Sequence, residues 1–289
     1  MKSFKFISII LLIFLVFSSC NILKNEKEYQ ELKNNVITYN QEEMFRISLS
    51  EAGLEDVFIQ HATGFEKIDN ESDWCQVFLL GNDRFEQSKL CDYYLAVLCD
   101  DKVYLKEAAI CSHGSGIELC DFDGDGDKEI LLQETVGMSG GAGQYSSSVL
   151  DFENGEFIEM FSDSVALYNG DNKTTGFSIE ILKGNKYKIK NSITDYSEIF
   201  DFKNKPEKYL DGLYDENGEV IKRKIYVDSF FDFIPNDVDN DGVYEIVCRQ
   251  YVSLIGHSDH LGDAKTVLKY NNKTDTFEII DAEFEPYEG

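Results

Sequence analysis

Along most of the chain, short apolar runs alternate with residues that form turns. Pairs of such runs occupy positions 93–99 and 102–106, 149–152 and 157–161, 177–182 and 186–189, 214 and 220–227, and 267–270 and 276–280. Asn154 and Gly155 separate the second pair, and an Asn-Gly dipeptide between apolar runs is typical of a two-residue hairpin turn. Strands of this length at this spacing predict an all-β domain.

A longer repeat is superimposed on these hairpins. An acidic loop, an apolar strand, a glycine-containing loop and a hairpin follow one another from residue 121 and again from residue 237. The copies begin about 116 residues apart, which leaves room for two or three blades of ~40–60 residues. We therefore expect a small or irregular β-propeller-like repeat domain of about four to six blades, with a β-sandwich as the alternative.

The two acidic loops share one spacing, DxDxDGxxE. Its acidic positions and its glycine are Asp121, Asp123, Asp125, Gly126 and Glu129 in the first copy, and Asp237, Asp239, Asp241, Gly242 and Glu245 in the second. Negative charges on alternate residues repel one another, so a hard cation among them favours an ordered loop. Calcium fits best, because it accepts six to eight oxygen ligands in a tolerant geometry. The glycine stands where the backbone must turn sharply around the ion.

The spacing differs from that of an EF-hand, which also begins DxDxDG. An EF-hand needs a bidentate glutamate at loop position twelve, and that position holds Leu132 in the first copy and Cys248 in the second. Apolar residues follow each acidic loop directly, at 130–132 and 246–248. They predict a buried strand where an EF-hand has a helix.

With this loop and strand, the chain resembles the calcium-loop β-repeats of the FG-GAP and VCBS type, which occur in many bacterial surface proteins. The resemblance covers residues 121–130 and 237–246. It implies that the acidic side chains named above bind calcium, together with the main-chain carbonyls of Asp127 and Val243. The alternative is a pair of solvated acidic turns.

The first twenty residues have the features of an export signal. Lys2 and Lys5 precede an apolar run at 6–17, and small residues lead to Cys20. The run is too short for a comfortable membrane span. The end of this segment resembles the bacterial lipobox, which implies that Cys20 is lipidated and holds the protein at the outer face of the cell membrane. Simple cleavage and an uncleaved anchor are the alternatives.

These features divide the chain into three parts. We expect an export signal at 1–19, a lipid-anchored tether at 20–50 that is disordered or contains one weak helix, and the β-repeat domain with both calcium loops at 51–289. The chain carries a formal net charge of −27, and nucleic-acid binding depends on basic residues that neutralise phosphates. The expected partners are therefore the membrane and a glycan or a surface protein, but not nucleic acid.

Cysteine usage leaves two interpretations open. Beyond Cys20, the cysteines are Cys75, Cys91, Cys99, Cys111, Cys120 and Cys248. An exported protein can pair such residues in disulfides, and none of them has the CxxC spacing of a redox or zinc motif. Buried free thiols are the alternative, since most of these cysteines stand in apolar, strand-like contexts.

Two glycine-containing loops, at 137–145 and 251–263, would share one rim of a propeller. Loop-lined faces are where ligands usually bind. The ligand-binding candidates on this rim are Tyr145, Tyr251, His257, Asp259 and His260. The last three residues could also contribute to a transition-metal site, and a polar loop tip without a ligand is the alternative.

The sequence lacks the HExxH and Walker A motifs of common enzyme classes. We therefore expect an exported, lipid-anchored, calcium-stabilised surface protein with a binding or structural role, and no catalytic activity. The alternative is a surface hydrolase or carbohydrate-processing enzyme that uses the two glycine-containing loops.

Overall fold

The computed structural model describes residues 39–54, 57–69, 74–82, 90–99, 102–112, 115–139, 142–162, 175–202, 205, 210, 212–221, 226–254 and 259–287. At some of these positions, Tyr145 among them, it describes the backbone alone. The predicted export signal, the predicted lipidation site Cys20 and the ligand candidate His257 lie outside the described residues.

The described residues form one helix followed by strands. The elements are α3 (Tyr39–Glu51), β1 (Val57–Glu66), β2 (Cys75–Asn82), β3 (Leu90–Cys99), β4 (Lys102–Ser112), β5 (Gly116–Cys120), β6 (Glu129–Ser139), β7 (Ala142–Glu153), β8 (Glu156–Ser162), β9 (Phe177–Leu182), β10 (Lys186–Asn191), β11 (Ser197–Asp201), β12 (Tyr226–Asn236), β13 (Glu245–Ser253), β14 (His260–Asn271) and β15 (Thr276–Pro286).

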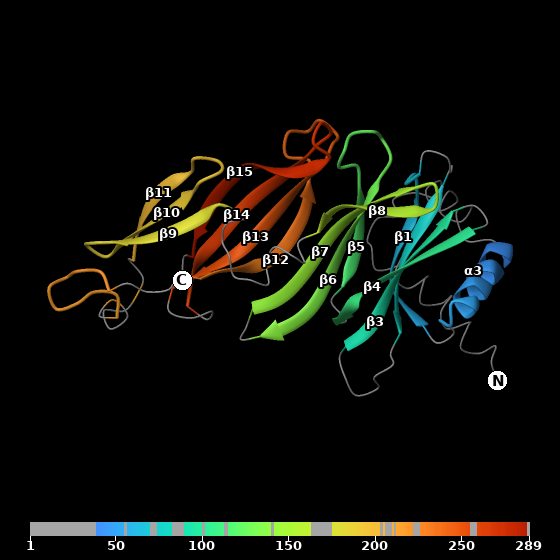
Figure 1. Cartoon of the computed structure of the whole chain (residues 1–289), viewed down its shortest axis with the longest axis horizontal. Helices are drawn as coiled ribbons and strands as arrows, with labels where there is room; N and C mark the ends of the chain where they lie inside the picture. Colours follow the sequence, from blue (N-terminus) through green and yellow to red (C-terminus); the bar gives the residue numbers. More distant parts are fainter. Residues whose placement is uncertain are drawn as a thin grey trace, which may run out of the picture. The chain divides into compact units, whose positions relative to one another are not determined.

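These strands form antiparallel sheets in which neighbours in the chain are neighbours in the sheet (Figure 1). We call β1–β4 the first sheet, β5–β8 the second, β9–β11 the third and β12–β15 the fourth. The protein is therefore all-β, as its sequence predicts. None of the sheets made by the described strands closes on itself.

Hairpin turns lie where the sequence places them. Asn154 and Gly155 have φ angles of 53° and 82° between β7 and β8, which is the positive-φ pair that a type I′ turn requires. Gly184 and Asn185, with φ of 79° and 58°, turn the chain between β9 and β10. The described residues of the run expected at 220–227 contribute the isolated bridge between Tyr214 and Val220 and the start of β12.

The prediction of a glycine-containing loop at 137–145 is wrong in large part, because most of these residues belong to strands. Strand β6 continues to Ser139 and β7 begins at Ala142, with Gly137 opposite Gln144 and Met138 opposite Gly143. A register shift between Thr135 and Gly137 lets the two strands remain paired beyond the point where a loop was expected. Such a bulge absorbs an irregular residue without ending the ladder.

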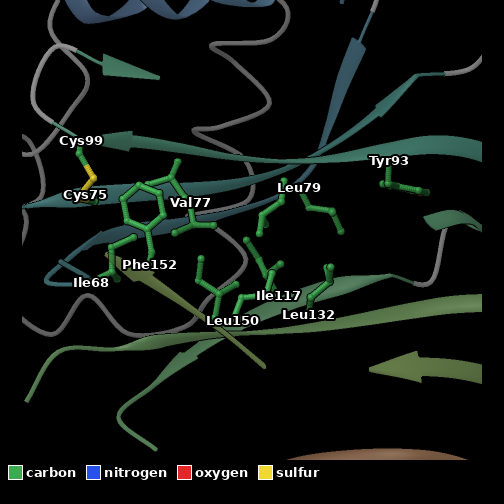
Figure 2. Close-up of a cluster of buried hydrophobic side chains, with 13 residues drawn as sticks. Ile68, Cys75, Val77, Leu79, Tyr93, Cys99, Ile117, Leu132, Leu150 and Phe152 are labelled. Atoms are coloured by element: carbon green, nitrogen blue, oxygen red, sulfur yellow. A yellow bond between two sulfur atoms is a disulfide. The ribbon is translucent and has the colours of Figure 1, made fainter. Parts of the chain in front are cut away.

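The second sheet is buried on both faces. Successive side chains of a strand point to opposite faces, so Ile130 and Leu132 lie in a cluster with Val77 of the first sheet, whereas Leu131 lies in a cluster with Ile246 of the fourth. Figure 2 shows the first of these clusters, with side chains of the two sheets directed toward one another. The first, second and fourth sheets therefore pack face to face.

The third sheet also packs on the fourth. Tyr187 and Ile189 of β10 share a buried cluster with Ala264 of β14 and Phe284 of β15. The ring centroids of Tyr187 and Phe284 are 6.1 Å apart in an edge-to-face arrangement, which is favourable for aromatic pairs. Sheet-on-sheet contact through apolar side chains thus recurs at every junction described.

The chain divides into two compact units, Met1–Glu43 and Met44–Gly289. Within the larger unit, Phe45 and Leu49 of α3 are buried, and the ring of Phe45 lies 4.8 Å from that of Phe78 in β2. The second half of the helix therefore packs against the first sheet. In the part of the chain that the structure describes, no helix has the length and apolar character to cross a bilayer.

One pair of cysteines forms a disulfide, and another pair remains as free thiols, so each interpretation is confirmed for one pair. Cys75 and Cys99 form a disulfide between β2 and β3 (Figure 2). Cys120 and Cys248 are buried free thiols. The side chains of Cys91 and Cys111 lie outside the described part of the molecule.

Candidate metal centre

Both acidic loops occupy the same place in their sheets. Residues 121–128 connect β5 to β6, and residues 237–244 connect β12 to β13. The strand predicted after each loop is present in both copies, and it begins at the loop's last acid. Gly126 and Gly242 have φ of 94° and 93°, a conformation that residues with a Cβ rarely adopt. The sharp turn predicted at these glycines is therefore confirmed.

Each loop brings three of its predicted ligands to one point. Within each group, one oxygen per carboxylate lies within 4.8 Å of the others, and the groups are Asp121, Asp123 and Glu129 in the first loop and Asp237, Asp239 and Glu245 in the second. Glu129 is 2% exposed and Glu245 is 0% exposed. Burying a carboxylate is costly unless it is paired or bound to a metal. A solvated acidic turn has no reason to bury a glutamate, so the buried glutamate of each loop favours a metal site over such a turn.

Backbone amides hold the first aspartate of each loop in place. Asp121 Oδ1 accepts a hydrogen bond from the Gly124 amide at 2.7 Å, and its Oδ2 accepts one from the Gly126 amide at 3.1 Å. In the second loop, Asp237 Oδ2 accepts from the Gly242 amide at 3.1 Å. A carboxylate has about four lone-pair positions, so both aspartates retain acceptor capacity for a cation.

The remaining predicted ligands do not belong to these two groups of three carboxylates. Asp125 and Asp241 are exposed, and each accepts a hydrogen bond from the amide two residues later, at 2.8 Å in both loops. The side chain of Asp127 is paired with Lys67. Binding through the carbonyls of Asp127 and Val243 stays a prediction.

The carboxylates of the first loop lie close together and are partly shielded from water. Burial raises the pKa of Glu129 to about 9; the Phe122 amide acts against this rise, and the charges of Asp123 and Asp121 add to it. Burial also raises the pKa of Asp151, a residue of β7, to about 6, with Glu153 and Asp123 acting in the same direction. Such crowding is relieved by a proton or a cation, and the donors are the hard oxygens that calcium prefers.

Lys269 of β14 enters the second loop, and the sequence analysis missed it. Its ammonium Nζ lies 2.5 Å from Glu245 Oε1, 3.2 Å from Asp239 Oδ2 and 3.4 Å from Asp241 Oδ2. The hydrogen bond with Glu245 is the main cause that raises the pKa of Lys269 above its usual range. Asp151 was missed in the same way, because both residues come from a strand whose register the sequence does not reveal.

The two loops touch each other. The amide of Tyr244, at the end of the second loop, donates to the carbonyl of Asp121 in the first at 2.8 Å. Asn272 Nδ2 donates to the carbonyl of Asp123, also at 2.8 Å. A Cβ on Gly124 would come within 3.0 Å of the Val243 side chain, so the loops are closely fitted.

The predicted ligand residues near the second glycine-containing loop are partly assembled. The rings of Tyr251 and His260 lie 4.7 Å apart. Two residues that the sequence analysis missed extend the group: Phe231 stacks on Tyr251 at 4.0 Å, and Tyr287 lies 5.3 Å from His260. We call these four side chains the aromatic cluster of the fourth sheet.

The polar ligand candidates are paired with neighbours. Asp259 forms an ion pair with Lys205 at 2.9 Å, and His260 Nε2 contacts Asp263 Oδ1 at 2.7 Å. Among the described residues, neither Asp259 nor His260 belongs to a group of three metal-ligating side chains. The hypothesis of a transition-metal site involving His257 therefore stays a prediction.

Comparison with known proteins identifies a match to one protein family and similarity to two proteins. Residues 175–285 match the family described as the YybI C-terminal domain. The uncharacterized protein YybI of Bacillus subtilis (strain 168) is 27% identical over 204 residues, 68% of this chain and 74% of that protein. Cartilage acidic protein 1 of Xenopus tropicalis is 38% identical over 65 residues, 22% of this chain but only 10% of that protein. No solved structure gives a significant match. The family match thus contains the second acidic loop and Lys269 but not the first loop.

Proposed function

We propose that this is an exported, lipid-anchored surface protein whose β-repeat domain is stabilised by calcium and serves a binding or structural role. The observation that carries the proposal is the pair of loops in which a buried glutamate converges with two aspartates. Oxygen donors alone, at a sharp glycine turn, suit calcium better than zinc or copper. In this proposal calcium is a folding ligand, which strengthens the contact between strands at the end of each sheet.

The repeat architecture is proposed to be a small or irregular propeller. Consecutive strands form meanders of four in the first, second and fourth sheets, and three strands in the third. Blades of a propeller are four-stranded antiparallel sheets, and face-to-face packing of these sheets through apolar clusters supports the same arrangement. Export is supported by the Cys75–Cys99 disulfide, since disulfides persist mainly in oxidising compartments.

Calcium is expected to raise the melting temperature of the purified protein. Extracellular modules bind calcium with dissociation constants of ~10⁻⁴–10⁻³ M, so 1 mM calcium should add about 0.5–1.5 kcal/mol for each loop that binds. For a domain of this size, 1 kcal/mol corresponds to a shift of about 2–4 °C. Differential scanning calorimetry in calcium and in chelator measures the shift.

Substitutions inside and outside the acidic loops test whether these loops cause the calcium-dependent rise in melting temperature. Asp121→Asn combined with Asp237→Asn should abolish the response to calcium, because each substitution removes a charge from one carboxylate group. Glu159→Gln, an exposed glutamate of β8 outside both loops, should leave the response intact. Identical melting temperatures of the unmodified protein in calcium and in chelator would contradict the proposal.

A second candidate function is glycan recognition by the aromatic cluster of the fourth sheet. Its specific support is the stacked pair of Phe231 and Tyr251, with ring planes 10° apart, beside Tyr287, which is 61% exposed. Aromatic rings present flat apolar surfaces next to polar groups, here the pair formed by His260 and Asp263.

This second function predicts binding to insoluble peptidoglycan in a sedimentation assay. Tyr251→Ala combined with Tyr287→Ala should weaken binding by about tenfold or more, since each aromatic contact contributes ~0.5–1.5 kcal/mol beyond its buried area. Trp74→Ala removes an aromatic side chain that is 58% exposed outside the cluster and serves as the control. Equal loss of binding in both variants, or binding unchanged in the double variant, would count against the cluster.

A further inference from the structure

The two acidic loops carry opposite charges at one equivalent position. Leu150 of β7 pairs with Ile130, the residue after Glu129, and Leu268 of β14 pairs with Ile246, the residue after Glu245. The next residue along each partner strand is Asp151 in the first copy and Lys269 in the second. Both therefore stand across from the buried glutamate of their own loop. An acid faces one glutamate, and a base faces the other.

In the second loop, the ammonium of Lys269 lies among the carboxylates. It lies between the buried Glu245 Oε1 at 2.5 Å and the oxygens of Asp239 and Asp241 at 3.2 and 3.4 Å. The other oxygen of Glu245 accepts from the Val238 amide at 3.1 Å. Both oxygens of this buried carboxylate thus have donors from the chain itself, as a buried charge requires.

In the first loop, the buried glutamate lacks such a partner. Glu129 Oε2 accepts from the Phe122 amide at 2.6 Å, whereas among the described residues no hydrogen-bond donor reaches its Oε1. The nearby lysines are engaged elsewhere: Lys67 pairs with Asp127, and Lys128 pairs with Glu66 at 3.0 Å. Asp151 adds a further carboxylate. Among the described residues, the converging carboxylates of the first loop therefore have no lysine equivalent to Lys269.

We propose that the two loops are unequal: the first binds the divalent cation, and the second is closed by Lys269, whose ammonium takes the place of an ion. The inference rests on the proposed calcium-binding function and assigns the ion to one loop. Calcium at the second loop must displace an ammonium from three carboxylates, whereas no described lysine lies among the converging carboxylates of the first loop. The resulting affinity difference follows from Coulomb interactions at short range.

The contact between the loops supports this division. Tyr244 of the second loop donates its amide to Asp121 of the first, so any two cations would lie in adjoining turns. A divalent ion repels a second divalent ion about twice as strongly as it repels an ammonium at the same distance. In the proposal, the ammonium of Lys269 keeps the second loop ordered and reduces the repulsion that a second divalent ion would cause.

Calcium stoichiometry tests the inference. In equilibrium dialysis of the purified full chain at millimolar calcium, we expect one bound calcium per chain, which Asp121→Asn removes and Asp237→Asn leaves in place. Lys269→Gln should strengthen binding at the second loop by roughly tenfold or more and bring the stoichiometry to two. Asp151→Lys should weaken the first site by a similar factor.

Two controls separate charge from folding. Lys269→Arg keeps the positive charge and should stay at one calcium, and Lys265→Gln removes a lysine of the same strand that pairs with Glu283 and should change nothing. A melt in chelator checks that each variant is folded, and its calcium-dependent shift is the second readout.

The outcomes distinguish the inference of unequal loops from the proposed calcium-binding function. Two equal sites in the unmodified protein, or one site lost with Asp237→Asn, would overturn the inference while leaving calcium binding intact. A folded Lys269→Gln variant with no additional calcium would also overturn it. Absence of calcium from the unmodified protein and from every variant would instead refute the proposed function itself.

Discussion

Replacing Phe122 with alanine is expected to lower the free energy of unfolding by about 3–5 kcal/mol, the usual range for a fully buried phenylalanine. Phe122 is 0% exposed although it lies inside the first acidic loop. Its ring packs 5.9 Å from that of Phe277, in the cluster shared by the second and fourth sheets. The loop is therefore anchored in the core by one of its own side chains.

The same substitution is expected to weaken calcium binding. The Phe122 amide donates to Glu129 Oε2 at 2.6 Å, so the position of the ring also determines where the buried carboxylate is held. A cavity beneath the loop would let the backbone shift, and a site that is less well ordered binds with lower affinity. Chemical denaturation measures the first effect, and calcium titration of the folded variant measures the second.

The second loop offers a matched control. Val238 stands at the position equivalent to Phe122, but it is 42% exposed. Val238→Ala should change stability by less than about 0.5 kcal/mol, as exposed substitutions usually do. Equal losses in the two variants would mean that the loops are anchored alike, contrary to their burial.

The sequence predicted the parts of the site that are local in the chain. Alternating acids followed by a glycine and a glutamate specify their own geometry, because a sharp turn brings residues within nine positions to one point. The hairpin turns at Asn154 and Gly155 were predictable for the same reason: the positive φ angles depend on the turn residues themselves.

Residues contributed by other strands were not predictable. Lys269 reaches Glu245 from another strand, 24 residues away in the chain, and only the register of β13 against β14 brings the two together. A register shift of one residue would place the lysine on the opposite face of the sheet. The same limit explains why Asp151, Phe231 and Tyr287 were missed, and the glycines that follow Val136 made a strand look like a loop.

The lysine beside one loop and the aspartate beside the other come from equivalent strands, β14 and β7, of their sheets. The two copies keep the same turn, the same buried glutamate and the same strand order. A difference at one neighbouring strand position, Asp151 against Lys269, is enough to invert the charge that faces the glutamate. In the proposed repeat architecture each copy interacts mainly with its neighbours, so the proposed replacement of a metal by a side chain in one copy would preserve the shared contact between the loops.

Removing the disulfide between β2 and β3 is expected to lower the free energy of unfolding by roughly 2–4 kcal/mol. Cys75 and Cys99 pair directly across the strands, with a sequence separation of 24, and are 0% and 2% exposed. Opening the bridge restores conformational freedom to the unfolded chain. The double variant Cys75→Ala and Cys99→Ala should show this loss in urea denaturation under oxidising conditions.

A reductant gives the internal control for this prediction. Dithiothreitol should lower the stability of the unmodified protein toward that of the double variant, and it should leave the double variant unchanged. Cys120→Ala combined with Cys248→Ala removes two buried thiols outside the bridge, so that variant should keep its response to reductant. An unmodified protein indifferent to reductant would contradict a stabilising bridge. It would leave the first sheet dependent on its apolar contacts with the second sheet and with α3, which are the other interactions that bury Cys75 and its neighbours.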